Sequence, residues 1–175
     1  DDAIIGNSGN DFLRGDAGDD YLFGNNHDDI LTGDESTDTV GGNDELSGGN
    51  GDDALAGGAG NDKMVGGDGR EFMIGGTGSD KMYGQDGHDL LLGGSDNDWM
   101  NGGRGDDCMA GQGGDDLMLG HMGDDFMTGG MGEDSLYGQA GHDTIAGNAD
   151  CDYIHGGGGH DLLFGGTAND TVNGG

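Results

Sequence analysis

Aspartates recur at every ninth position over most of this 175-residue chain, each after a glycine-rich stretch. From Gly48 to Asn173 the period runs through fourteen consecutive nine-residue units without slippage. Positions one to six of a unit read Gly-Gly-x-Gly-x-Asp, as in Gly57–Asp62, and a three-residue segment centred on an apolar side chain follows. Carboxylates and the backbone carbonyls of such turns are the oxygen ligands that hard divalent cations prefer. The spacing therefore predicts repeated metal-binding turns.

The units are regular at the positions that define them. Glycine occupies position one in all fourteen units, Asp occupies position six in thirteen, and position eight is always apolar. Earlier units open at Gly6, Gly15, Gly24 and Gly33. The pattern is irregular at residues 34–47, where we expect a shortened unit opening at Gly42 that lacks three turn residues. We interpret residues 1–175 as a single repeat domain.

The strands that must carry these turns are only three residues long. Such a unit cannot bury its one apolar side chain alone, so successive units must stack. Glycine at positions one, two and four supplies positive φ and lets neighbouring turns approach closely. The predicted core is the position-eight column: Leu55, Met64, Met73, Met82, Leu91, Met100, Met109, Met118, Met127, Leu136, Ile145, Ile154, Leu163 and Val172. A methionine run could indicate copper or redox chemistry, but unbranched Met also fills a narrow core, which we favour.

The tandem Gly-Gly-x-Gly-x-Asp units resemble the calcium-binding nonapeptide repeats of RTX (repeats-in-toxin) proteins, and the resemblance covers essentially the whole chain. It implies an all-β fold: a right-handed parallel β-roll solenoid with two nonapeptide units per coil. It implies Ca²⁺ as the cofactor, about one ion per nonapeptide, each held between turns two units apart. It also implies a secreted, extracellular or cell-surface protein exported by a type I system.

The resemblance further implies two ladders of metal-binding side chains, one on each edge of the roll. The first edge would use Asp53, Asp89, Asp107, Asp125, Asp143 and Asp161, continued N-terminally by Asp2, Asp20 and Asp38. The second edge would use Asp62, Asp80, Asp98, Asp116, Asp134, Asp152 and Asp170, continued by Asp11, Asp29 and Asp44. Glu71 holds a first-edge place, but its extra methylene and the neighbouring Arg70 predict a weak or empty site.

The charge of the chain supports a metal partner. Thirty-six acidic and five basic side chains give a formal charge of −31, which with low hydrophobicity is typical of disorder. About sixteen dications would supply roughly +32 charges, so we expect folding to depend on calcium. An acidic surface of this kind repels nucleic acid and anionic lipid. Apolar runs of three residues are far too short for a membrane span.

The two outward faces are expected to differ. One face would be uncharged and would carry Ala3, Ile5, Tyr21, Phe23, Thr39 and Gly41 with the position-seven and position-nine side chains of alternate units from Ala54 to Phe164. The other would carry Arg14, Glu45, Lys63 and Lys81. An apolar face of this length predicts lateral pairing with a partner or a second copy. Tyr83, Trp99, Tyr137 and Tyr153 could form a carbohydrate-stacking strip, although ordinary strand propensity also explains them.

Two functions remain open at this point. Asp1–Ile5 and Gly174–Gly175 together nearly complete one unit, which predicts either head-to-tail stacking or a piece of a longer array. One function is therefore a secreted structural β-roll that assembles into an extracellular filament or surface matrix. The alternative is the folding and secretion module of an exoenzyme, toxin or adhesin. No catalytic constellation can be placed in the sequence, so we expect a non-enzymatic chain.

Overall fold

The computed structural model describes residues 1–34 and 41–175, and within them the fold is all-β, with nineteen parallel-paired strands and no helix. One sheet has ten strands: β1 (Ala3–Ser8), β3 (Tyr21–Asn26), β5 (Glu45–Asn50), β7 (Lys63–Gly69), β9 (Lys81–Gly87), β11 (Trp99–Arg104), β13 (Leu117–Met122), β15 (Ser135–Ala140), β17 (Tyr153–Gly158) and β19 (Thr171–Asn173). The other has nine: β2 (Phe12–Arg14), β4 (Ile30–Thr32), β6 (Ala54–Ala59), β8 (Phe72–Thr77), β10 (Leu90–Ser95), β12 (Cys108–Gly113), β14 (Phe126–Met131), β16 (Thr144–Ala149) and β18 (Leu162–Gly166).

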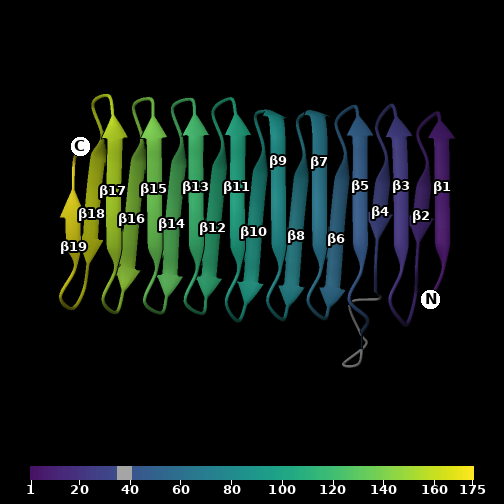
Figure 1. The fold of residues 1–175 in the computed structure, drawn as a ribbon, viewed down its shortest axis with the longest axis horizontal. Helices are drawn as coiled ribbons and strands as arrows, with labels where there is room; N and C mark the ends of the chain where they lie inside the picture. The colour runs from purple at the N-terminus through teal and green to yellow at the C-terminus, as the bar shows by residue number, and fades with distance from the viewer. Residues whose placement is uncertain (35–40) are drawn as a thin grey trace.

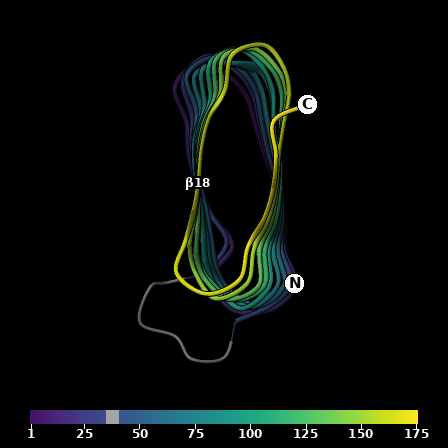
Figure 2. The same cartoon turned by 90° about the vertical axis from the view of Figure 1, so that its left-hand side faces the viewer.

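The chain alternates between these two sheets and forms a parallel β-solenoid (Figure 1). Leu91, for example, pairs with Met73 and Met109, each 18 residues away, so one coil contains two nonapeptides. Viewed along the solenoid, the coils superpose as a flattened ring with a turn at each end (Figure 2). The predicted fold of two units per coil is confirmed.

Position-eight side chains fill the space between the sheets. Those from Leu46 to Ile154 are at most 1% exposed, and the seven core methionines among them are completely buried. Alternation places positions seven and nine on the outside, as expected for strands with one buried face. The methionine column is therefore core packing. Leu163 and Val172, in the last coils, are only partly covered.

Register across residues 34–47 differs from the predicted shortened unit. Tyr21 pairs with Glu45 and Ile30 with Ala54, a step of 24 residues where other coils step by 18. This coil therefore contains six residues more than the others, instead of a unit shortened by three. As a result β1 and β3 lie in the same sheet as β5 and β7, and β2 and β4 lie with β6.

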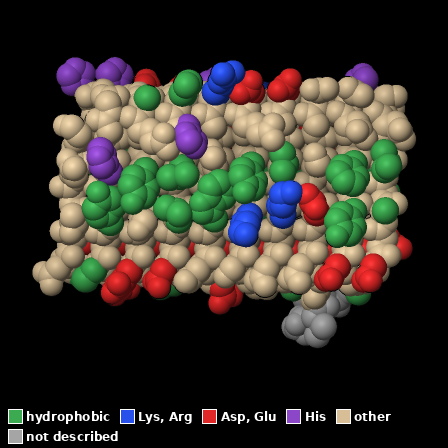
Figure 3. Space-filling view, viewed as in Figure 1, with side chains coloured by type: hydrophobic (Ala, Val, Ile, Leu, Met, Phe, Trp, Pro, Cys, Tyr) green, Lys and Arg blue, Asp and Glu red, His purple; other side chains and the backbone are tan. Residues whose placement is uncertain are grey.

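This register corrects the predicted faces. Ala3, Ile5, Tyr21 and Phe23 lie on the ten-stranded sheet with Glu45, Lys63 and Lys81, and Arg14 lies on the nine-stranded sheet. Thr39, which the prediction also placed on the uncharged face, lies outside the described residues. From Ala54 to Phe164 the nine-stranded face remains uncharged, and Phe126, Leu162 and Phe164 on it are about half exposed. The ten-stranded face carries a hydrophobic band interrupted by charged side chains (Figure 3).

Glycine serves two different purposes in the turns. At positions two and four the backbone has positive φ, as at Gly58 (117°) and Gly60 (136°), which glycine adopts without strain. Position one is not in that region, contrary to the sequence-based expectation. There, at Gly57, a Cβ would overlap the carboxylate of Asp62, so position one is glycine for lack of space. The described residues include no helix long and apolar enough to cross a bilayer.

Candidate metal sites

Sixth-position aspartates form a buried ladder along each edge of the solenoid. Except at Asp53 and in the last coil, the backbone N–H of each residue donates to Oδ1 of the aspartate one coil further on, as from Asp62 to Asp80 (2.8 Å) and from Asp80 to Asp98 (2.9 Å). The aspartate's own carbonyl accepts from position seven of the next coil, as from Lys81 to Asp62 at 2.8 Å. Each carboxylate is therefore held in one orientation by the neighbouring coil.

The second oxygen of these carboxylates has no partner. In the described chain, Oδ2 is buried and makes no hydrogen bond in sixteen of the nineteen predicted aspartates: Asp11, Asp20, Asp29, Asp44, Asp53, Asp62, Asp80, Asp89, Asp98, Asp107, Asp116, Asp125, Asp134, Asp143, Asp152 and Asp161. Leaving a charged oxygen buried and unpaired costs several kcal/mol, on the order of the penalty for an isolated buried ion. So regular a set of unsatisfied oxygens indicates a missing positive ligand.

Backbone carbonyls surround these oxygens. Oδ2 of Asp80 lies against the Cα of Gly75, where the carbonyl of Gly93 from the next coil also approaches. Carbonyls at position four, such as that of Gly60, point along the solenoid at the same position of the next turn, here Gly78. Each turn thus combines one anionic oxygen with several carbonyl oxygens, which is the donor set that Ca²⁺ prefers over softer metals.

Burial alters the acidity of the ladder. It raises the pKa of Asp80 to about 8 and those of Asp107, Asp116, Asp125 and Asp134 to about 7. The charges of carboxylates one coil away contribute to these raised pKa values. The backbone N–H bond from the preceding coil acts in the opposite direction and lowers them. A cation bound between the turns would lower the pKa values of these carboxyl groups, because its positive charge favours the ionised carboxylate.

Glu71 interrupts the first ladder. Its side chain is buried, and in the described structure its carboxyl oxygens accept no bond from the N–H of Asp53; their side-chain partner is the carboxyl group of Asp89. Burial and the adjacent Asp89 raise the pKa of Glu71 to about 9. Arg70 does not enter the turn as predicted: its guanidinium is exposed and pairs with Asp52 (Nη2–Oδ2, 2.6 Å). The extra methylene of Glu71 alone thus distinguishes this turn.

The register assigns the N-terminal aspartates to edges opposite to those predicted. Asp2 and Asp20 continue the ladder of Asp44 and Asp62, and Asp11 and Asp29 continue that of Asp53, with bonds from Asp20 to Asp44 and Asp29 to Asp53 at 2.8 and 2.7 Å. The remaining three predicted residues differ from the sixteen. Asp2 is exposed, Asp170 is half-buried and accepts a bond from Asp152, and Asp38 lies outside the described residues.

A second ladder, which the sequence did not predict, runs along the outside of the same turns. Here the N–H at position five donates to the position-five side chain one coil earlier, as from Ser79 to Asn61 (2.7 Å) and from Asp124 to Asp106 (2.8 Å). Histidine also accepts: the N–H of His160 bonds to Nδ1 of His142 at 2.9 Å. Frequent short acceptors at position five were the signal available in the sequence.

The described side chains do not gather into a metal cluster of their own. No group of three or more His, Cys, Asp or Glu side chains among them could hold an ion. Backbone carbonyls of the turns are the other oxygen ligands that the described chain offers beside each carboxylate. The ladder supplies those carboxylates at a fixed interval, so the residues present are suited to a row of calcium ions on each edge.

Comparison with known proteins agrees with this donor set. The sequence profile of the RTX calcium-binding nonapeptide repeat (4 copies) matches in ten segments, which overlap from residue 65 on: residues 5–40, 41–64, 65–100, 74–109, 83–118, 92–127, 101–136, 119–153, 128–163 and 147–175. No curated protein matches the chain. The glycine turns, the buried aspartate ladders and this match over nearly every residue lead to one conclusion: the chain belongs to the RTX calcium-binding nonapeptide repeat family.

Proposed function

We propose that this chain is a secreted structural β-roll whose folding is driven by calcium bound at its sixth-position carboxylates. The observation that carries the proposal is the set of sixteen buried Oδ2 atoms without partners, many of them beside a carbonyl of the next coil, as Asp80 is beside that of Gly93. A site that exists only in the folded coil converts the free energy of ion binding into free energy of folding. The carboxylates serve stacking and not catalysis, because each is enclosed in its own turn.

Circular dichroism and calorimetry of the full chain test this proposal. In millimolar Ca²⁺ we expect a β-rich spectrum and a stoichiometry near one ion per nonapeptide. Excess chelator should abolish the β signal, and Mg²⁺ should restore it poorly, because Mg²⁺ demands near-ideal octahedral geometry and gives up water reluctantly. A β-rich spectrum that persists in chelator would contradict the proposal.

End-to-end assembly is the more specific form of the structural role. In the described structure β1 and β2 at one end, and β18 and β19 at the other, have an edge with no neighbouring strand. Exposed strand edges are templates for further pairing, so another coil could add there, from a second copy or from a longer polypeptide. The part of the nine-stranded face from Ala54 to Phe164, which is uncharged, offers a surface for lateral association once calcium offsets the charge of the chain.

Electron microscopy and analytical ultracentrifugation distinguish assembly from the alternative role as a folding and secretion module of an exoenzyme, toxin or adhesin. Filaments that form in calcium and dissolve in chelator would support assembly. Monomers that fold in calcium and do not assemble at any calcium concentration would favour the module. Under that alternative, fusion of a cargo enzyme to the chain should raise the yield of refolded cargo when calcium is added.

A further inference from the structure

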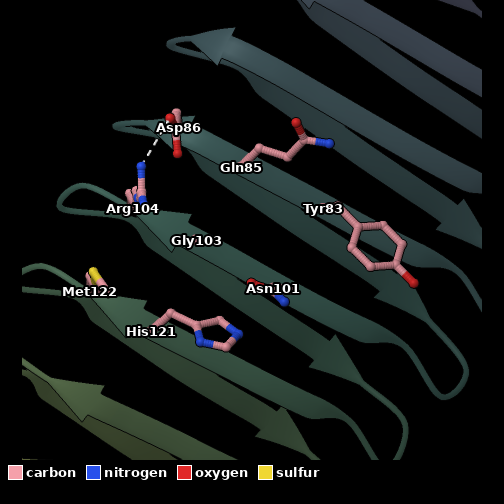
Figure 4. Close-up of a pocket in the computed structure, with 8 residues that line it drawn as sticks. All are labelled: Tyr83, Gln85, Asp86, Asn101, Gly103, Arg104, His121 and Met122. Atoms are coloured by element: carbon pink, nitrogen blue, oxygen red, sulfur yellow. Dashed lines mark ion pairs between the residues drawn. The ribbon is translucent and has the colours of Figure 1, made fainter.

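A shallow groove crosses the outer face of the ten-stranded sheet over β9, β11 and β13 (Figure 4). Its volume is about 340 Å³, within the range of small-molecule sites. The floor lies on β11, where Gly103 has no side chain and stands between Gln85 and His121 at the same position of the adjacent coils. The groove therefore exists because one coil lacks a side chain that both of its neighbours carry.

Polar groups without partners line this groove. Within the described chain the side chains of Gln85, Asn101 and His121 make no hydrogen bond or ion pair with other residues, and Figure 4 shows them along the groove. Two amides and an imidazole can both donate and accept hydrogen bonds. Such a mixed set suits a ligand with several hydroxyl groups, since a hydroxyl also donates and accepts.

The charges of the groove favour a neutral ligand. The single arginine among the lining residues, Arg104, is paired with Asp86 at the rim (Nη1–Oδ2, 3.6 Å). No lysine lines the groove, and the chain carries a formal charge of −31. Bound calcium offsets most of that charge in the loaded chain, so the local contacts decide: an anionic ligand would meet only an arginine that is already paired with Asp86.

An aromatic surface closes one end. Tyr83 lines the groove, and its ring lies 4.6 Å from that of Trp99, centroid to centroid, at 50°. Tyr137 and Tyr153 form a second aromatic pair, with their ring centroids 5.6 Å apart. The predicted aromatic strip is therefore two separate pairs and not one continuous surface. An aromatic ring offers an apolar face for C–H groups beside a polar edge. We infer that this groove binds one unit of a neutral oligosaccharide, with the sugar ring against Tyr83 and its hydroxyls bonded to Gln85, Asn101 and His121.

The test uses the calcium-loaded full chain. Trp99 is the only tryptophan, so its fluorescence reports on the groove, and calorimetry provides a second readout. The probes are neutral gluco- and manno-oligosaccharides, an oligogalacturonate as the acidic counterpart, and glycerol as a plain polyol. We expect saturable binding of a neutral oligosaccharide at a Kd on the order of 1 mM or below, and at least tenfold weaker binding of the acidic one and of glycerol.

Two substitutions taken from neighbouring coils keep the fold and remove the contacts. Asn101→Leu introduces the residue found one coil later at Leu119, and His121→Gly introduces the residue found one coil earlier at Gly103. Each should weaken sugar binding at least tenfold, whereas Gln139→Gly, at the same position outside the groove, should leave it unchanged. Circular dichroism of each variant in calcium checks the fold. Three results would overturn the inference: no saturable response to any neutral sugar, tighter binding of the acidic probe, or groove variants that bind the sugar with the affinity of the wild-type chain.

Discussion

The inner and outer ladders of each turn make the same kind of bond with different residues. Both hold a backbone N–H with a side-chain acceptor one coil away, and they run in opposite directions along the solenoid. On the outside, at position five, Asn61, Asp106 and His142 all serve as acceptors. On the inside, the described units use Asp, with Glu71 the exception. If the N–H bond were the only requirement, asparagine would serve inside as well, so the inner position needs its second, anionic oxygen.

Replacing that oxygen alone should have the largest effect. In Asp98→Asn the Oδ1 acceptor for the N–H of Asp80 is kept, but the charge is lost. We expect the free energy of unfolding in saturating calcium to fall by about 3 kcal/mol, the linkage lost with one ion at roughly 100 times its Kd. Urea titration in calcium measures the loss, and calorimetry should count at least one ion fewer. An unchanged ion count would mean that the second oxygen is not a ligand.

Acid should affect the inner ladder in opposite ways with and without calcium. In the metal-free fold the pKa values of Asp80 and Asp107 are raised to about 8 and 7, above the unfolded value near 4. Their contribution to stability is therefore present below pH 4 and is lost as the pH rises through 7 to 8. In chelator, a lower pH therefore favours the folded solenoid over the unfolded chain.

In calcium the sign reverses, because the ion requires ionised carboxylates. Because the metal-free chain is unfolded and its carboxylates ionise near pH 4, the calcium midpoint for folding should be nearly constant from pH 8 to 6 and should rise as the pH falls below about 5. Calcium titrations followed by circular dichroism at several pH values measure this shift. A midpoint that rises about tenfold per unit between pH 8 and 6 would mean that calcium binds to a metal-free fold with raised carboxylate pKa values, which would contradict calcium-driven folding.

Repairing the interrupted turn should have a smaller effect. Glu71→Asp shortens the side chain to that of the other inner positions and should restore the acceptor for the N–H of Asp53. We expect a gain of about 1 kcal/mol in the free energy of unfolding from the hydrogen bond, and one more bound ion. Thermal unfolding and calorimetry test both. Loss of stability would show that the glutamate is accommodated better than its missing bond from Asp53 indicates.

The outer ladder should give the smallest effect. Asp106→Asn keeps an acceptor for the N–H of Asp124 and removes only an exposed charge. The free energy of unfolding in calcium should change by less than about 0.5 kcal/mol, with the ion count unchanged. This variant is the matched control for Asp98→Asn. If it lost an ion, the outer side chains would also belong to the metal sites.

Features that depend only on a residue's position within the nine-residue unit could be predicted from the sequence. Met100 could be assigned to the core and Asp98 to a turn because the nine-residue period fixes which side chains point inward. The sheet to which a strand belongs depends instead on how many half-coils precede it. A deficit of three residues and an excess of six leave the same phase in a nine-residue repeat but differ by one half-coil. Asp20 was therefore assigned to a turn correctly and to an edge wrongly.

Other features have no periodic signal. The outer ladder mixes Asp, Asn and His, which share only the ability to accept a hydrogen bond. The groove at Gly103 depends on the residues that happen to lie beside it on two neighbouring coils, 18 positions away in each direction. Such cross-coil combinations become visible only once the register is known.

The 24-residue step between Asp20 and Asp44 shows that the length of one turn is independent of coil stacking. Strands β3 and β5, and β4 and β6, pair normally on either side of it. A foreign peptide or small domain placed between Asp34 and Gly41 should therefore be carried without breaking either sheet. The solenoid could then hold the inserted segment at a defined point along a rigid rod. Withdrawal of calcium would unfold the rod and so remove this fixed position.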